Sequence, residues 1–267
     1  MQGLITEQTG CALTVTLNRP QQRNALNSAT LDELERKLGE AEDNPQLRAL
    51  VIRGAGGNFC AGGDLADMLE AQQAYSDGNQ RAFTELSRRY GGLLQALKRS
   101  RLVIICAVEG VVMGGGVGLV CASDFTIAAP GSRFSLPETR LGLIPAQIAP
   151  FLNSRIGPGQ TRRLALAGEI LDAAEAQHIG LVHQLAVSAE ELGRGVDGIL
   201  DNIRRSAPGA LATTKTLVRR SGEISDEELG ALLDEAAEDF SAAVLSEEAK
   251  EGAMAFIEKR KPYWAQE

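Results

Sequence analysis

The sequence has few of the residues on which several classes of catalytic and metal-binding proteins depend. Only two histidines occur, His178 and His183. They lie five apart in the chain, whereas helical zinc motifs place them four apart, and no cysteine cluster assists them. No GxSxG motif is present to hold a serine nucleophile. The four cysteines form no CxxC pair, and their apolar or glycine-rich neighbours indicate buried free thiols, which suit a reducing cytoplasm. We therefore expect neither a bound metal nor a Ser-His-Asp triad.

Long apolar runs and an excess of positive charge are also missing. No run reaches the roughly 18 residues of a membrane span, and the first residues, MQGLITEQTG, lack the features of a secretory signal. Lys and Arg number 27 against 35 Asp and Glu, which gives a net charge of −8. This balance disfavours nucleic acids and anionic membranes as partners. We expect a cytoplasmic protein that binds neither.

What remains is ordinary globular composition with alternating strand and helix signals. The continuous apolar run 102–108 (LVIICAV) is typical of a buried strand, and 30–41 places Leu at helical spacing, so the chain belongs to the α/β class. The polar stretch 71–80 indicates a loop. From about Ala207 only helical patterns occur. The sequence therefore predicts a core at 1–206 and a helical C-terminal region at 207–267.

Two glycine clusters stand out, Ala61-Gly62-Gly63-Asp64 and Gly114-Gly115-Gly116. Neither fits GxGxxG or a phosphate-binding loop. Glycines before a helix can instead aim two backbone N–H groups at one oxygen, as stabilisation of an enolate requires. The alternative is two tight strand-to-helix turns, in which Asp64 is only a helix N-cap.

A set of short segments, spread over the whole chain in a fixed order, is specific when taken together. The segments are Asn18-Arg19-Pro20, Arg23-Asn24-Ala25-Leu26-Asn27, Phe59-Cys60-Ala61-Gly62-Gly63-Asp64-Leu65, Gly114-Gly115-Gly116, Leu136-Pro137-Glu138, Leu141-Gly142-Leu143-Ile144-Pro145, Ala173-Ala174-Glu175-Ala176, Gly180-Leu181-Val182 and Lys250-Glu251-Gly252 with Phe256 and Glu258-Lys259-Arg260. In this order they resemble the enoyl-CoA hydratase/isomerase (crotonase) family.

The resemblance implies a crotonase-type spiral of ββα repeats whose helical C-terminal region forms trimer contacts, giving a homo-oligomer that is a trimer or a dimer of trimers. It implies an acyl-CoA substrate, with coenzyme A as part of that substrate and no permanently bound cofactor. The thioester oxygen would lie between the N–H groups of Ala61 and Gly115, with Gly63 as the alternative to Ala61. The residues expected along coenzyme A are Arg23, Ala25, Gly62, Gly63, Asp64, Leu65, Phe256 and Lys259, the last two from the same or a neighbouring subunit. Lys259 lies in a charged run that is equally typical of a solvated surface.

The carboxylates show where the chain departs from the family. Two-glutamate hydratases have one glutamate at the position of Gly118 and another at Glu138, so only the second is retained here. Glu138 lies in an apolar stretch where burial would raise its pKa, as an acid that protonates C2 of the substrate requires. The alternative is a surface glutamate at a turn. Glu109 is a possible second carboxylate, and Arg140 could hold a second anion on the substrate or form a structural ion pair.

The segment 141–151 is similar to the branch that hydrates 3-methylglutaconyl-CoA and isohexenylglutaconyl-CoA. We therefore expect hydration of a branched, carboxylated 2-enoyl-CoA, which makes the protein a lyase of acyl-CoA catabolism. An enoyl-CoA isomerase, which needs one carboxylate, and a non-catalytic CoA-binding subunit remain as alternatives.

Overall fold

The computed structural model describes residues 3–222 and 226–266. Within these ranges the main sheet has the order β1-β2-β3-β4-β6-β9, with β1 antiparallel to β2 and the later neighbours parallel. Its strands are β1 (Leu4–Thr9), β2 (Ala12–Leu17), β3 (Ala49–Gly54), β4 (Val103–Val108), β6 (Phe125–Ala128) and β9 (Gln184–Leu185). A smaller sheet in the order β5-β7-β8 contains β5 (Val111–Met113), β7 (Arg133–Ser135) and β8 (Ile170–Asp172).

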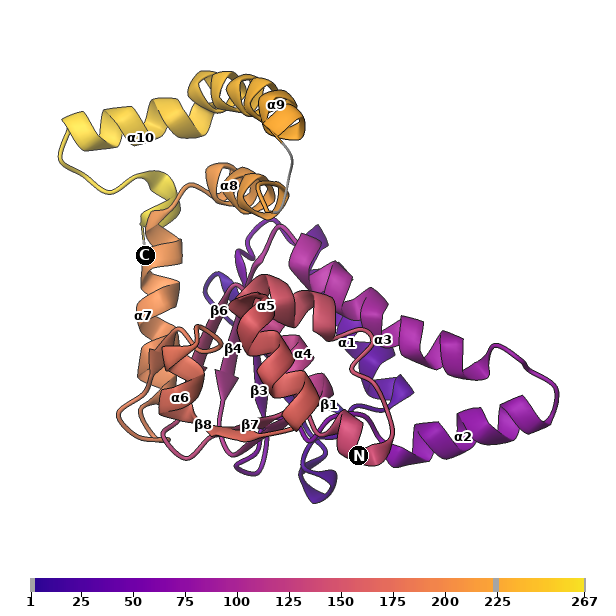
Figure 1. The fold of residues 1–267 in the computed structure, drawn as a ribbon. Helices are drawn as coiled ribbons and strands as arrows, with labels where there is room; N and C mark the ends of the chain where they lie inside the picture. Colours follow the sequence, from indigo (N-terminus) through magenta and orange to yellow (C-terminus); the bar gives the residue numbers. More distant parts are fainter. Residues whose placement is uncertain (1–2, 223–225, 267) are drawn as a thin grey trace.

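Helices cover both faces of the main sheet (Figure 1). Because side chains alternate along a strand, Leu50 and Ile52 of β3 face one core while Ala49 and Val51 face another. The first core is closed by α1 (Ser28–Asp43), α3 (Ala82–Arg99), α4 (Gly115–Ala122) and α5 (Ala149–Ala167), and the second by α7 (Leu192–Arg205). The buried strand and the helix expected at 102–108 and 30–41 are confirmed as β4 and α1.

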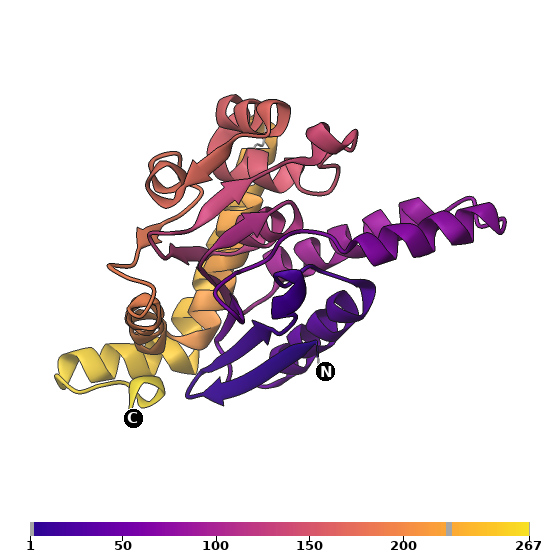
Figure 2. The same cartoon turned by 90° about the horizontal axis from the view of Figure 1, so that it is seen from below.

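The loop expected at 71–80 is wrong over most of its length. Helix α2 (Leu65–Ser76) continues through it, and only the residues after Ser76 connect α2 to α3. The polar sequence suits an exposed helix, because α2 buries only Ala71 and rests on α3, with the Tyr75 and Phe83 rings 5.9 Å apart. The α2–α3 pair projects from the body of the molecule (Figure 2).

The chain beyond 207 is helical, as expected. It forms α8 (Pro208–Arg220), α9 (Asp226–Leu245) and α10 (Glu247–Ile257), followed by a short 3-10 helix, η3 (Tyr263–Ala265). These helices lie above the sheet in Figure 1, and α8 among them contacts α3. Helix α6 (Ala173–His178) contacts β7, β8 and β9. The boundary at 206/207 stays a prediction. No helix in the described ranges has the length and apolar character that crossing a membrane requires.

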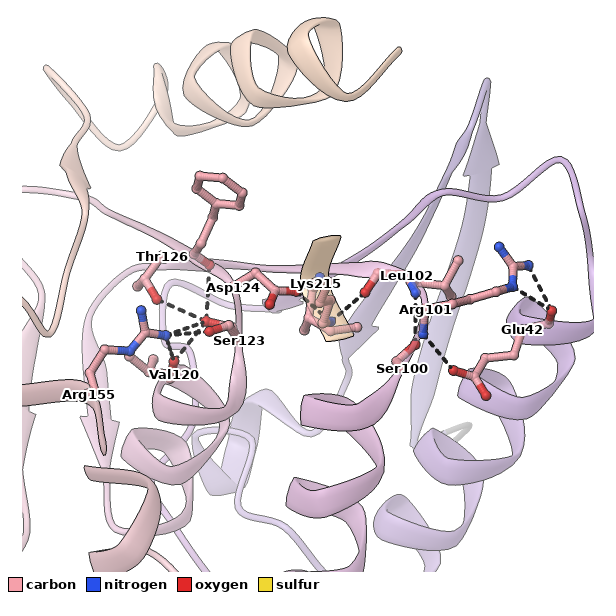
Figure 3. A network of polar contacts seen from close by, with 12 residues as sticks. Glu42, Ser100, Arg101, Leu102, Val120, Ser123, Asp124, Thr126, Arg155 and Lys215 are labelled. Atoms are coloured by element: carbon pink, nitrogen blue, oxygen red, sulfur yellow. Dashed lines mark hydrogen bonds and ion pairs between the residues drawn. The ribbon is translucent and has the colours of Figure 1, made fainter. Parts of the chain in front are cut away.

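A polar network joins α8 to the body of the protein (Figure 3). The Lys215 Nζ lies 2.6 Å from the Asp124 carboxylate and donates to the Leu102 carbonyl at 2.6 Å. Asp124 also accepts the Ile104 N–H at 2.7 Å. Only 11% of the Lys215 side chain is exposed. Burial lowers the pKa of Lys215, and the nearby Asp124 carboxylate raises it only in part. The Lys215 ammonium group therefore connects α8 to the body of the protein through Asp124 and Leu102.

Replacing Lys215 by Met is expected to destabilise the fold, because it leaves the Asp124 carboxylate without its cation in a partly buried site. Exposed pairs contribute up to about 1 kcal/mol and loss of one partner of a fully buried pair costs about 3–5 kcal/mol, so we expect roughly 2 kcal/mol. Urea unfolding measures the effect. The matched control is Lys250→Met, whose exposed pair with Glu247 should contribute little. Equal midpoints for the two variants would contradict the tethering role.

Candidate active site

A cavity of about 220 Å³ opens between the α2–α3 pair, the start of α4 and the segment before α5. Its wall is mostly apolar, with a few polar groups that converge on it. The lining residues are Leu26, Leu31, Gly63, Asp64, Asp67, Met68, Leu86, Ser87, Tyr90, Gly115, Glu138, Ile144, Pro145, Ala146, Gln147 and Ile148. An apolar cleft with a few convergent polar groups is the usual form of a small-molecule site.

Glu138 lies at the start of a 3-10 helix, η2 (Glu138–Leu141), directly after Pro137. Its Oε2 is buried and has no hydrogen-bond partner among the described residues. Its Oε1 would be 2.9 Å from a Cβ at position 114, so glycine at that position makes room for the carboxyl group. Burial raises the pKa of Glu138 above the usual 4.5. Such a carboxyl group is suited to exchanging protons with a bound substrate.

The triple glycine forms the start of α4 beside Glu138. The Gly114 N–H donates to the Ser135 carbonyl at 3.1 Å, with Gly114 at a φ of 49° that glycine tolerates. Gly115 is the first helical residue, so its N–H has no acceptor within the helix. A Cβ on Gly116 would lie 2.6 Å from the Cys60 carbonyl oxygen, so α4 can pack against the segment that contains Cys60 only with glycine at position 116. The helix start thus presents a free N–H to the cavity.

The first glycine cluster lies against the second, and it corrects one expectation. The Ala61 N–H donates to the Arg23 carbonyl at 3.0 Å, so it is not free to bind a thioester oxygen. Gly63 lines the cavity and forms a parallel bridge with Leu26, in which the hydrogen bonds use neighbouring groups and leave the Gly63 N–H without a partner in the described chain. The alternative donor, Gly63, therefore fits the geometry and Ala61 does not.

Of the other residues expected along coenzyme A, Asp64 lines the cavity, and Arg23, Ala25, Gly62 and Leu65 lie within three residues of a lining residue in the chain. Arg23 is exposed and ends the short 3-10 helix η1 (Pro20–Gln22) in a left-handed conformation, and Ala25 is half-buried. Asp64 caps α2 through the Ala66 N–H and pairs with Arg19 at 2.6 Å. Burial alone would raise the pKa of Asp64, but the hydrogen bond from Ala66 and the ion pair with Arg19 outweigh it and lower this pKa. Asp64 therefore serves the structural role considered above, while Gly62 lies against α4 and Leu65 is exposed.

Phe256 and Lys259 are not brought to the cavity by their own chain. They lie in and just after α10, which stands far from α2, α3 and α4 in both views (Figures 1 and 2). Phe256 and Lys259 are expected to reach coenzyme A from the same or a neighbouring subunit, and their distance from the cavity leaves only the neighbouring subunit. Phe256 is 86% exposed, so its ring has little cover from this chain.

Two further candidates fall outside the cavity. Glu109 faces a different hollow, on the α7 side of the sheet, together with Arg53 and Val196. Arg140 folds back on the body of the protein and donates to the Ala167 carbonyl at 3.1 Å. Glu109 is therefore not a second carboxylate of this site, and Arg140 does not hold an anion within it.

Tyr90 is a functional candidate that sequence reasoning missed, because an aromatic residue at helical spacing is typical of a core position. Its hydroxyl donates to the Gly115 carbonyl at 2.5 Å. The same oxygen lies 2.0 Å from where a Cβ of residue 118 would be, so it occupies the space of any side chain there. Gly118 and a large aromatic residue on the neighbouring helix were the available signal. Gln147, also missed, donates to the Ser87 hydroxyl at 3.2 Å across the cavity.

The remaining negative expectations concern metals and thiols. No disulfide joins any of the four cysteines and all four are buried, which confirms their interpretation as buried thiols. Burial raises the pKa of Cys60, Cys106 and Cys121 to about 12, so these thiols are protonated at neutral pH. Within residues 3–222 and 226–266 no group of three or more His, Cys, Asp or Glu is arranged to hold a metal.

Comparison with known proteins assigns the chain to a family. The sequence profile of the enoyl-CoA hydratase/isomerase family matches residues 7–267. The chain belongs to this family. Relatives include carnitinyl-CoA dehydratase of Proteus mirabilis, 34% identical with 98% of both chains covered, and short-chain-enoyl-CoA hydratase of Clostridium acetobutylicum, 33% identical with 98% of this chain and 97% of the relative covered.

Solved structures confirm the expected α/β crotonase fold. An enoyl-CoA hydratase/isomerase from Marinobacter aquaeolei superposes with a TM-score of 0.93 at 46% identity, covering 100% of both chains. AtuE of Pseudomonas aeruginosa gives the same TM-score and identity, covering 99% of this chain and 100% of the other. The arrangement of Glu138 and Gly115 is therefore interpreted as a site of the enoyl-CoA hydratase/isomerase family.

Proposed function

We propose that this chain is an enoyl-CoA hydratase, which adds water across the C2–C3 double bond of a 2-enoyl-CoA thioester. The supporting observation is the Glu138 carboxyl group, whose buried Oε2 has no hydrogen-bond partner among the described residues, beside the N–H at the start of α4. Relatives named as hydratases support the same activity.

Addition of water at C3 moves electrons onto the thioester oxygen, and the N–H groups of Gly63 and Gly115 stabilise the resulting enolate. Each is a backbone donor whose position does not change during the reaction, and the helix start adds partial positive charge. Glu138 supplies the proton that ends on C2. Arg23, Ala25 and the backbone from Gly62 to Leu65 lie along coenzyme A, and a neighbouring subunit brings Phe256 and Lys259.

The acyl group is branched. The lining offers bulky apolar side chains on several sides, among them Leu26, Met68 and Ile144. The family branch favours a carboxylated chain, but no Lys or Arg lines the described cavity, while three carboxylates do. A buried carboxylate without a cation is costly, and Ser87 and Gln147 would be its neutral donors. The geometry therefore favours an uncharged branch over the carboxylated one.

A panel of 2-enoyl-CoA thioesters in ¹⁸O-labelled water tests the proposal. It includes straight, branched and branched carboxylated acyl chains. We expect label at C3 and the highest kcat/KM for an uncharged branched chain. A preference for the carboxylated chain would refute the charge assignment alone. Double-bond migration without label would identify an isomerase, and tight binding without turnover would identify a binding subunit; either result would refute the hydratase.

We also propose a homo-oligomer built from trimers. Helices α9 and α10 expose large apolar side chains, including Leu233, Phe240, Leu245, Phe256 and Ile257. Exposed apolar surface of this kind is usually covered by a partner. Sedimentation velocity at micromolar concentration is expected to give a trimer or a hexamer, and a stable monomer would contradict the proposal.

A further inference from the structure

The cavity has one carboxyl group free for chemistry but two tasks to perform at C2 and C3. Asp67 accepts hydrogen bonds from the Ser28 N–H at 2.5 Å and from its hydroxyl at 2.7 Å, and Asp64 is engaged by Arg19. Glu138 alone keeps an unpartnered buried oxygen among the described acids of the lining. Position 118 is glycine and supplies no side chain. The attacking water needs a second polar group to hold it.

Tyr90 supplies an oxygen in the space that a side chain at position 118 would use. Its hydroxyl oxygen lies 2.0 Å from the position of a Cβ on Gly118, and its ring lies 3.5 Å from that of a Cβ on Gly115. Tyr90, Gly115 and Glu138 line the same cavity. The phenol therefore belongs to the same cavity as the carbonyl-binding N–H of Gly115 and the carboxyl group of Glu138.

The hydrogen bond to Gly115 fixes the role that the Tyr90 hydroxyl can play. A carbonyl oxygen only accepts, so the phenol proton must point to Gly115 across the 2.5 Å contact. The oxygen lone pairs are then left to accept a hydrogen bond from another molecule. Burial raises the pKa of Tyr90 well above its ordinary value, so the group stays neutral and is no base.

We propose that the Tyr90 hydroxyl binds and orients the water that adds to C3, in place of a carboxylate at position 118. The proposal rests on the proposed hydratase function. One O–H of the water donates to Tyr90, and Glu138 takes the other proton as the water oxygen bonds to C3. The C2–C3 π electrons move to the thioester oxygen as an enolate. The protonated Glu138 then gives its proton to C2, which restores the carboxylate.

The test separates water addition from proton exchange at C2. Hydration of an enoyl-CoA needs both steps, whereas deuterium uptake at C2 of a saturated acyl-CoA needs Glu138 and the two N–H groups but no bound nucleophile. Tyr90→Phe keeps the ring and removes the hydroxyl. We expect its kcat for hydration to fall about 10²-fold, as misplacement of a reacting group costs. We expect KM and C2 exchange to stay within about threefold.

Tyr75→Phe is the matched control, because this tyrosine lies on α2 outside the cavity lining. Both of its rates should equal those of the wild type. If hydration and exchange fall together in Tyr90→Phe, Tyr90 acts only by holding Gly115, and the proposal is overturned. Unchanged hydration overturns it as well. A wild type that hydrates no thioester in the panel would instead refute the hydratase function before any variant is compared.

Discussion

Glu138→Gln is expected to abolish net hydration and solvent-deuterium entry at C2, while acyl-CoA still binds. Glutamine keeps the size and hydrogen bonding of the side chain but cannot exchange a proton. Removing a general acid–base group costs about 10²–10⁴-fold in rate. Hydration with the purified variant, followed together with deuterium uptake, measures the loss. Persistence of both near the wild-type rate would make Glu138 structural.

The same variant carries its own test of folding, because burial raises the pKa of the Glu138 carboxyl. A carboxyl group with a folded pKa above its unfolded value binds more protons in the folded state, so the wild type loses stability as the pH rises from the unfolded to the folded pKa. Glutamine has no such penalty. The variant should therefore gain stability relative to the wild type at neutral pH compared with low pH. Glu7→Gln, on the exposed face of β1, is the matched control for activity and should keep the wild-type rates.

Gly118→Glu is not expected to rescue the Glu138→Gln variant, for a steric reason as well as a chemical one. Any Cβ at position 118 meets the Tyr90 hydroxyl oxygen at 2.0 Å, so the tyrosine must move before a glutamate fits. A new carboxylate there would also lie at the water-binding place rather than at C2. The site is thus committed to one carboxylate by the packing of α3 on α4.

Much of the fold could be predicted from local patterns, since the apolar run of β4 and the Leu spacing of α1 are decided within their own segments. Helix α2 could not. Its sequence is polar because only Ala71 is buried, and its support comes from α3, which lies later in the chain. Neither periodicity nor composition reports such a contact, so the polar stretch on its own predicts a loop.

The candidate site divides in the same way. Glu138 and Gly115 could be found because the segments around them resemble a family over short stretches. The choice between Ala61 and Gly63 depended on which N–H the Arg23 carbonyl captures, and Arg23 lies in a different segment. Recognising Tyr90 as a residue of the site requires knowing that α3 packs on the start of α4. Contacts between distant segments therefore decided what the residues alone left open.

The start of α4 is the second place where a large effect is expected. Proline is favoured as the first residue of a helix, so Gly115→Pro can keep the helix while removing the N–H that binds the thioester oxygen. Gly114, at a φ of 49° and a ψ of −113°, has the freedom that the residue before a proline needs. Loss of one such donor lowers kcat by about 10²–10³-fold. Much of the affinity for coenzyme A should remain, because the variant leaves the residues proposed to lie along coenzyme A unchanged.

Gly115→Ala is the matched control, because alanine adds a side chain but keeps the N–H. Its Cβ would meet a terminal methyl group of Leu26 at 3.3 Å and the Tyr90 ring at 3.5 Å, which requires a shift of a few tenths of an ångström. Steady-state kinetics on both variants, after circular dichroism shows retained helix, separates lost donation from crowding. An equal loss in both would mean that bulk at position 115 blocks the substrate. Proline has no backbone N–H, so unchanged turnover in a folded proline variant would show that the Gly115 N–H does not bind the thioester oxygen.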